Sequence, residues 1–292
     1  MMEILMNYTF QIVALGSVIL AVAAAPVGAF SVYKGQSLIG DAIGHSTFPG
    51  IILAYMAFAT RSPVILLAGA ILAGAASYAL IQLAHRDKRL GLDANLAIFL
   101  SGFFGLGMAL KSFIQGNPDY AGASQAGLGT YIFGQAAYML EADVQLICIV
   151  SAVVLLLLLL FYKELKLFVF DAEYAEVAGL PCRLLNILLL VMTIAVIGIG
   201  IKAVGAILIS SFLIIPCVAA NQWSSSLSRV LFLSSGIGAA SALIGTYIST
   251  LEQGMSTGPS IILTASLIAF FSILFGTRGI LGRVLKRRQR NG

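Results

Sequence analysis

Charged residues are scarce in this sequence of 292 residues: only 10% are Asp, Glu, Lys or Arg, whereas 60% are hydrophobic. A water-soluble domain carries about a quarter of its residues as charges, so the composition excludes a solvated globular surface. The mean hydropathy of +1.00 agrees with this exclusion. Because about 20 apolar residues span a bilayer as a helix, the chain has room for several spans and little else. We therefore expect an all-α, polytopic membrane helical bundle.

The residues that most enzymes need are also few. Three cysteines, Cys148, Cys182 and Cys217, lie far apart in or beside apolar stretches, which fits neither a disulfide framework nor a zinc-site spacing. Only two histidines are present, His45 and His85, and neither belongs to a set of residues suited to covalent catalysis. The sequence contains no Gly-Lys dipeptide and therefore no Walker A phosphate-binding loop. We expect no ATPase site and no permanently bound cofactor in this chain.

Charge spacing divides the sequence into nine apolar segments. They lie near 10–33, 37–59, 62–84, 93–114, 143–162, 183–201, 203–221, 228–250 and 259–277. The basic run 85–89 follows the third segment and should be cytoplasmic by the positive-inside rule. Alternating crossings then place all 17 Lys and Arg residues on the cytoplasmic side except Arg61, Lys111 and Lys202. This topology puts the N-terminus outside and the C-terminus in the cytoplasm.

The number of full crossings is predicted as eight to nine. Segments 183–201 and 203–221 are separated only by Lys202, so they could form a hairpin that stays partly buried. Residues 130–140 follow a turn at 116–119 and are too short to cross, which indicates an interfacial or re-entrant helix. The spans leave little chain for a soluble domain, so we expect one transmembrane domain over 1–292. The six basic residues of the C-terminal tail are typical topology determinants rather than a nucleic-acid site.

An acid and a histidine lie inside the second segment. Asp41 and His45 are four residues apart, so on a helix they share one face, about 6 Å apart along the axis. If the helix runs on from an inner interface at Lys34, its rise puts Asp41 about 10 Å and His45 about 16 Å into the membrane. A carboxylate and an imidazole at this spacing can bind one divalent cation, Mn, Fe or Zn, with little selectivity. Alternatively, the two side chains bond only to each other or to a neighbouring helix.

Small and helix-breaking residues surround this pair. Pro49 and Gly50 follow one turn later and should kink or break the helix, which makes them candidate hinge residues. Gly40 and Gly44 would allow a second helix to come close. Other polar residues in the apolar segments are expected to form hydrogen bonds between helices: Asn95, Asn186, Ser210 and Ser211.

Several motifs together are typical of one family. They are Gly40-Asp41-Ala42-Ile43 with His45 and Pro49-Gly50, then 101–107, 131–135, 171–175 with Gly179, 204–208 through 215–216, and 256–259. In this combination the chain resembles, over nearly its whole length, the permease subunits of manganese/zinc/iron ABC importers. The resemblance implies a permease of the bacterial cytoplasmic membrane that moves a divalent metal inward, with Asp41 and His45 on the transport path.

The resemblance also implies partners. They are a separate ATP-binding subunit, an extracytoplasmic metal-binding protein, and a second permease, either a copy of this chain or a paralogue. A cytoplasmic segment near 165–181 would dock on the ATPase, through Asp171, Glu173, Tyr174, Glu176 and Gly179. The segment also has the pattern of a short amphipathic helix with acids near its start and a glycine at its end, which could instead lie on the membrane surface.

Two rival functions follow from the same residues. In a proton-coupled secondary transporter, Asp41 and His45 would relay protons, and no ATPase would be needed. A permease for metal chelates, of the siderophore or cobalamin type, would share the ATP-driven machinery but would not need a metal-binding pair.

Overall fold

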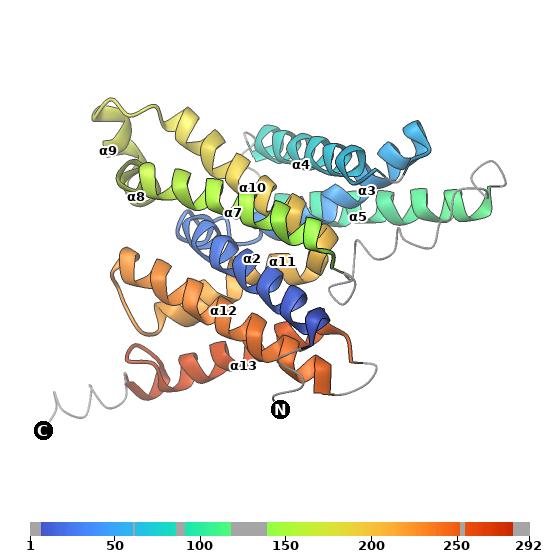
Figure 1. Cartoon of the computed structure of the whole chain (residues 1–292). Coiled ribbons are helices and arrows are strands. Elements are labelled where there is room, and N and C mark those ends of the chain that lie inside the picture. Colours follow the sequence, from blue (N-terminus) through green and yellow to red (C-terminus); the bar gives the residue numbers. More distant parts are fainter. Residues whose placement is uncertain (1–6, 61, 86–90, 118–138, 252–254, 283–292) are drawn as a thin grey trace, which may run out of the picture.

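The computed structural model describes residues 7–60, 62–85, 91–117, 139–251 and 255–282. All regular secondary structure in these ranges is helical, as expected (Figure 1). The helices are α2 (Tyr8–Tyr33), α3 (Ile39–Phe58), α4 (Pro63–His85), α5 (Leu92–Gly116), α7 (Glu141–Leu160), α8 (Tyr162–Phe170), α9 (Ala172–Val177), α10 (Cys182–Val204), α11 (Ala206–Asn221), α12 (Leu227–Leu251) and α13 (Thr257–Phe275). The motif at 131–135, most of the segment 130–140, the basic residues 86–89 and the tail from 283 onward lie outside the described residues.

Each of the nine predicted apolar segments falls on one of these helices. By length and composition, seven described helices could cross a membrane, and α3 and α11 are not among the seven. Helix α11 has 16 residues, which reach only about 24 Å against a hydrocarbon core of about 30 Å. Ten of its residues are buried. The count of eight to nine full crossings stays a prediction.

The boundary between α10 and α11 was predicted at the wrong residue. Lys202 lies inside the last turn of α10, and the chain turns at Gly205 instead. Gly205 has a φ of +86°, a region that glycine enters readily and other residues rarely do. The charge pattern located the helix pair correctly, but backbone conformation sets where one helix ends and the next begins.

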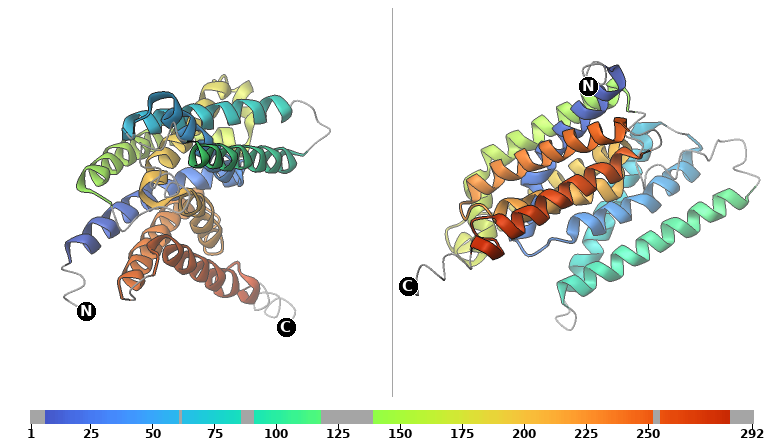
Figure 2. Two further views of the ribbon diagram at one scale, coloured as in Figure 1. Left: turned by 90° about the vertical axis from the view of Figure 1, so that its right-hand side faces the viewer. Right: turned by 90° about the horizontal axis from the view of Figure 1, so that it is seen from below.

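Contacts between helix ends agree with an alternating, antiparallel arrangement. At one end Tyr33 donates a hydrogen bond to Asn221, Tyr162 and Ser228 hydroxyls lie 2.7 Å apart, and the Arg278 amide donates to Gln222. At the other end Tyr8 donates to Glu141, and the hydroxyls of Ser249 and Thr257 lie 3.2 Å apart. The start of α2 and the end of α13 therefore belong to opposite ends of the bundle (Figure 2). Which end faces the cytoplasm stays a prediction from the charges.

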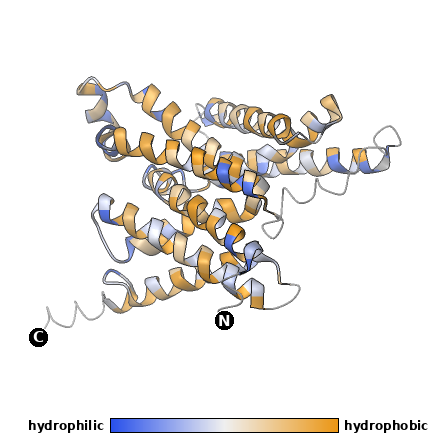
Figure 3. Ribbon diagram, viewed as in Figure 1, coloured by the Kyte–Doolittle hydropathy of each residue, from blue (hydrophilic) through white to orange (hydrophobic). Residues whose placement is uncertain are grey.

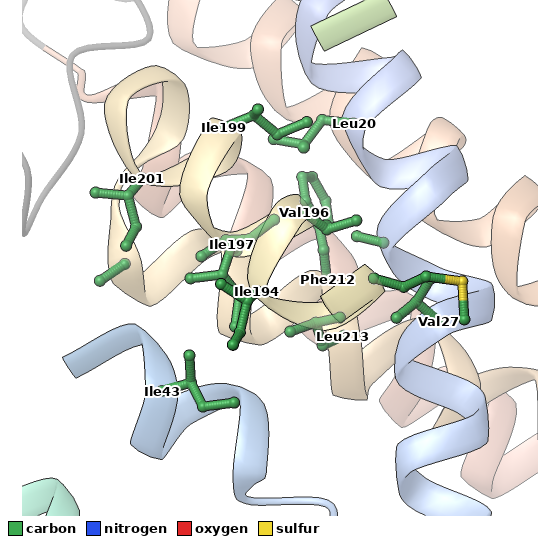
Figure 4. Close-up of a cluster of buried hydrophobic side chains, with 14 of the residues drawn as sticks. Leu20, Val27, Ile43, Ile194, Val196, Ile197, Ile199, Ile201, Phe212 and Leu213 are labelled. Carbon is green, nitrogen blue, oxygen red and sulfur yellow. The ribbon is translucent and has the colours of Figure 1, made fainter. Parts of the chain in front are cut away.

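The bundle has a buried centre with a helix group on either side. Helices α2, α10 and α11 run through the middle, between the α3–α5 group and the α12–α13 pair (Figures 1 and 2). Aliphatic and aromatic side chains from α2, α3, α10 and α11 meet there: Leu20, Val27, Ile43, Ile194, Val196, Ile197, Phe212 and Leu213 (Figure 4). The helices are hydrophobic along most of their length, and the hydrophilic residues gather toward the helix ends (Figure 3).

Glycines let the central helices come into backbone contact. A Cβ placed on Gly28 of α2 would lie 1.9 Å from the carbonyl oxygen of Leu213 in α11. A Cβ on Gly50 of α3 would lie 2.2 Å from the carbonyl oxygen of Gly69 in α4. Because lipid supplies no hydrophobic force between helices, such close packing is a main source of their association. Gly50 therefore holds α3 against α4 and fixes the position of the residues that α3 carries.

Candidate functional site

Asp41 and His45 lie together on α3, as the spacing predicts. The Oδ1 atom of Asp41 is 3.4 Å from Nε2 of His45. The imidazole is 17% exposed and the carboxylate 32%, so both side chains are partly accessible. Asp41 is in the first turn of α3, where the helix dipole favours a negative charge.

The depth predicted for this pair depends on a helix running from Lys34, and the helix does not run from there. Helix α2 ends at Tyr33, residues 34–38 turn the chain, and α3 begins only at Ile39. Lys34 itself does not mark an open interface, because its amine donates to Asn186, inside α10. Asp41 is thus at the start of its helix, after a turn in which Gly35 and Leu38 are exposed and the other residues are partly buried.

Three other helices position the part of α3 that carries Asp41 and His45. The ring of Phe104 in α5 meets the His45 imidazole edge-on, with centroids 5.0 Å apart and planes at 82°. A Cβ on Gly44 would lie 3.3 Å from Oγ of Ser210 in α11. On the α4 side, the hydroxyl of Ser46 lies 2.7 Å from that of Ser77. The pair therefore sits on a helix that is held by α4, α5 and α11.

The predicted break at Pro49 and Gly50 does not occur, because α3 is helical from Ile39 through Phe58. Pro49 still changes the local hydrogen bonding, since it has no N–H to donate to the carbonyl of His45 one turn earlier. Nearby hydroxyls bond to other carbonyls of this turn: Ser46 donates to Ala42 at 2.6 Å and Thr47 to Gly44 at 2.6 Å. Because of Pro49, the carbonyl oxygen of His45 lacks the helical hydrogen bond that an N–H at position 49 would donate.

The pair can bind a divalent cation, but it supplies only part of a coordination shell. A carboxylate oxygen and an imidazole nitrogen are suitable donors for zinc or manganese, which take four or more ligands. Among the residues that the structure describes, no group of three or more His, Cys, Asp or Glu side chains could hold a metal ion. An ion bound by this pair alone would therefore keep open coordination positions.

The predicted coupling residues form an exposed corner at the end of the bundle that carries Lys34. Asp171 begins α9 by accepting a hydrogen bond from the Tyr174 amide at 2.9 Å. Gly179 has a φ of +80° and ends it, with its amide and that of Leu180 bonded back to Glu176 and Ala175. Every side chain of residues 171–178 except that of Ala175 is exposed, among them Glu173, Tyr174, Glu176 and Val177. The predicted short helix is confirmed, with apolar and acidic side chains both facing outward.

Sequence reasoning missed two sets of neighbours. Phe104 lies in a glycine-rich run that the sequence singled out, but nothing in the run indicates that its ring meets His45. The contacts of Lys34 were missed because a lysine between two apolar segments indicates a membrane interface but not which side chains it contacts. Among the predicted hydrogen-bonding residues, Asn186 donates to the Tyr78 hydroxyl at 2.9 Å, as expected. The amide nitrogen of Asn95 is buried without a partner.

Comparisons with known proteins agree with this arrangement. The chain is 38% identical to the zinc transport system membrane protein TroC of Treponema pallidum (strain Nichols), over 99% of this chain and 96% of that protein. It is also 38% identical to the manganese transport system membrane protein MntC of Bacillus subtilis (strain 168), over 94% of this chain and 63% of that longer protein. Among solved structures, PsaBC from Streptococcus pneumoniae in complex with Fab matches with a TM-score of 0.83 and 28% identity, covering 98% of this chain and 97% of that one.

A family model covers almost the same stretch. It describes the ABC 3 transport family and matches residues 6–276, which include every helix described above. With this match and relatives of 38% identity over nearly the whole chain, the protein belongs to the ABC 3 transport family.

Proposed function

We propose that this chain is the membrane-spanning subunit of an ATP-driven importer of zinc or manganese, with Asp41 and His45 as ligands of the ion in transit. The observation that carries the proposal is the 3.4 Å approach of these two side chains on α3 in a member of this family. The relatives described above are named for zinc and for manganese. Carboxylate with imidazole suits both ions and does not choose between them.

The partial coordination shell suits a transported ion rather than a resident one. A closed cage of four protein ligands would hold zinc tightly, whereas two ligands leave positions for water or for another protein chain. Both side chains are accessible, so a second permease subunit could bring its own ligands to the same ion. We infer a permease pair with the ion bound between subunits, supplied from outside by an extracytoplasmic metal-binding protein.

The energy for transport would come from a separate ATPase. The chain contains no Gly-Lys dipeptide and so no Walker A loop. The exposed corner at α9 offers a docking element, with Tyr174 59% and Val177 86% exposed beside Glu173 and Glu176. Apolar side chains this exposed at a helix corner outside the long helices are typical of a contact with a partner. We infer that this corner inserts into the ATPase subunit.

Movement of α3 would change access to the ion. Pro49 removes one helical hydrogen bond at His45, and Gly50 is packed against Gly69. A small bend of α3 at Pro49 and Gly50 would move the N-terminal part of the helix, which carries Asp41 and His45, relative to its C-terminal part. We infer that Pro49 and Gly50 act as the hinge between outward and inward access.

The proton-coupled alternative makes a different prediction about energy. We expect proteoliposomes that hold this chain with its ATPase to take up ⁶⁵Zn or ⁵⁴Mn when ATP is present on the ATPase side. A pH gradient without ATP should drive no uptake above that of empty vesicles. Uptake driven by the gradient in vesicles that lack the ATPase would reject the proposal and favour the secondary transporter.

A further inference from the structure

The turn between α2 and α3 is bonded firmly to the end of α2. The Lys34 amide donates to the carbonyls of Phe30 and Val32, and the Gln36 amide donates to Ser31 at 2.9 Å. Gly35, with a φ of +74°, reverses the chain between them. Asp41 follows only seven residues after Lys34, with most of that stretch inside this hydrogen-bonded turn and the first turn of α3. A displacement of Lys34 is therefore passed on to the start of α3.

The side chain of Lys34 joins three further helices to this turn. Its amine donates to the amide oxygen of Asn186 in α10, and that amide donates to the Tyr78 hydroxyl of α4 at 2.9 Å. The same amine lies 5.0 Å from the ring centroid of Phe168 in α8, a cation–π distance. Burial lowers the pKa of Lys34 to about 8, in keeping with an amine that is enclosed by these neighbours.

Helix α8 also contacts the end of α2 through a second pair. The rings of Tyr33 and Phe170 have centroids 5.3 Å apart, and both residues are close in sequence to the Lys34–Phe168 contact. Phe170 is the last residue of α8, and Asp171 leads directly into α9. The exposed corner at α9 and the turn before Asp41 are thus connected by α8 through two aromatic contacts.

We propose that Lys34 is a positioning residue for transport, which transmits displacement of the α8–α9 segment to α3. This proposal rests on the proposed function, because it requires an ATPase that moves α9. Phe168 receives the displacement through α8, the Lys34 amine follows it, and the rigid turn carries it to Asp41 and His45. The hydrogen bond from Lys34 to Asn186, and that from Asn186 to Tyr78, keep α10 and α4 in place relative to the turn while it moves.

The test measures ATP hydrolysis and metal uptake in the same proteoliposomes, with the complete complex of permease, ATPase and binding protein. Lys34→Met keeps the length of the side chain but removes its charge and its donors. We expect the uptake of ⁵⁴Mn or ⁶⁵Zn per ATP hydrolysed to fall about three- to tenfold, with the hydrolysis rate within twofold of the unmodified complex. Lys34→Arg keeps a cation over Phe168 and a donor for Asn186, so it should restore most of the ratio.

Two further variants guard against a simple folding defect. Lys163→Met removes an exposed lysine from the same helix as Phe168 and should leave the ratio unchanged. Phe168→Leu keeps apolar volume but removes the ring, and should lower the ratio even if Lys34→Met does not assemble. An unchanged uptake per ATP hydrolysed in Lys34→Met or Phe168→Leu overturns the proposal. A fall of uptake and of hydrolysis by the same factor overturns it as well. Failure of the unmodified complex to couple uptake to ATP would instead overturn the proposed function itself.

Discussion

At the scale of single residues, the candidate site depends on how the His45 ring is held. The imidazole has Asp41 at 3.4 Å, and the ring of Phe104 packs nearly perpendicular to it with centroids 5.0 Å apart. These two neighbours restrict the orientation of the His45 ring, so its nitrogen points in a defined direction before an ion binds. This preorganisation lowers the entropy lost on binding.

Removing the aromatic neighbour should weaken ion capture without removing a ligand. An aromatic contact contributes about 0.5–1.5 kcal/mol beyond its buried area, so we expect Phe104→Ala to raise the KM for metal uptake about two- to tenfold. The measurement is initial uptake of ⁶⁵Zn or ⁵⁴Mn against metal concentration, at matched protein level. Phe103→Ala changes the neighbouring ring, on a different face of α5, and should leave KM within twofold. Equal effects of the two variants would contradict the role assigned to Phe104.

The sequence was sufficient to predict that Asp41 and His45 lie together, but not what surrounds them. An i, i+4 spacing brings Asp41 and His45 together on any helix, so their proximity follows from local geometry. The contact with Phe104 depends on how α5 packs against α3, which no local pattern encodes. The contacts of Lys34 were missed for the same reason, since Phe168 and Asn186 are more than 130 residues away.

At the scale of helices, glycine positions determine how closely the central elements approach. Gly28 brings α2 into contact with the backbone of α11. Gly245 does the same for α12 and α13, since a Cβ added there would lie 2.4 Å from Cα of Ile261. Because close packing stabilises helix association in lipid, such positions should tolerate no added methyl group.

Gly28→Ala should therefore destabilise the bundle. Its new Cβ would overlap the carbonyl of Leu213, a backbone atom that cannot rotate away, so we expect a loss of about 2–3 kcal/mol. Gly236→Ala is the matched control, because Gly236 lies in α12 with no heavy atom within 4 Å of the added carbon. There the substitution should be neutral or should stabilise the helix by up to about 1 kcal/mol. Thermal unfolding of the purified protein in detergent distinguishes the two, and equal midpoints would refute the packing argument.

The existence of the helices could be predicted, but their ends could not. Long uncharged windows identify apolar helices because a charge inside the bilayer is costly, and this held for all nine segments. The ends depend on backbone conformation at single residues. Helix α10 ends just before Gly205 rather than at Lys202. Helix α3 begins only at Ile39, because residues 34–38 form a turn.

At the scale of the whole molecule, the proposed ion ligands and the exposed corner belong to different parts of the bundle. Asp41 and His45 are carried by α3, in the group with α4 and α5, whereas α8 and α9 project from the end of α7 (Figure 1). Central helices α2, α10 and α11 lie between them. A transporter built this way can receive ATP-driven force at one place and change ion access at another.

The most direct test of this account is metal uptake by cells that carry Asp41→Ala or His45→Ala, with ⁶⁵Zn or ⁵⁴Mn at equal amounts of membrane protein. Asp93→Ala and His85→Ala are matched controls, since both residues are exposed and lie at helix ends. We expect either site variant to lose at least about 90% of the uptake, because each substitution removes one of the two ligands that this chain supplies to the ion. The controls should keep rates near those of the unmodified protein. Unmodified rates in both site variants would contradict the assignment of Asp41 and His45 to the ion path.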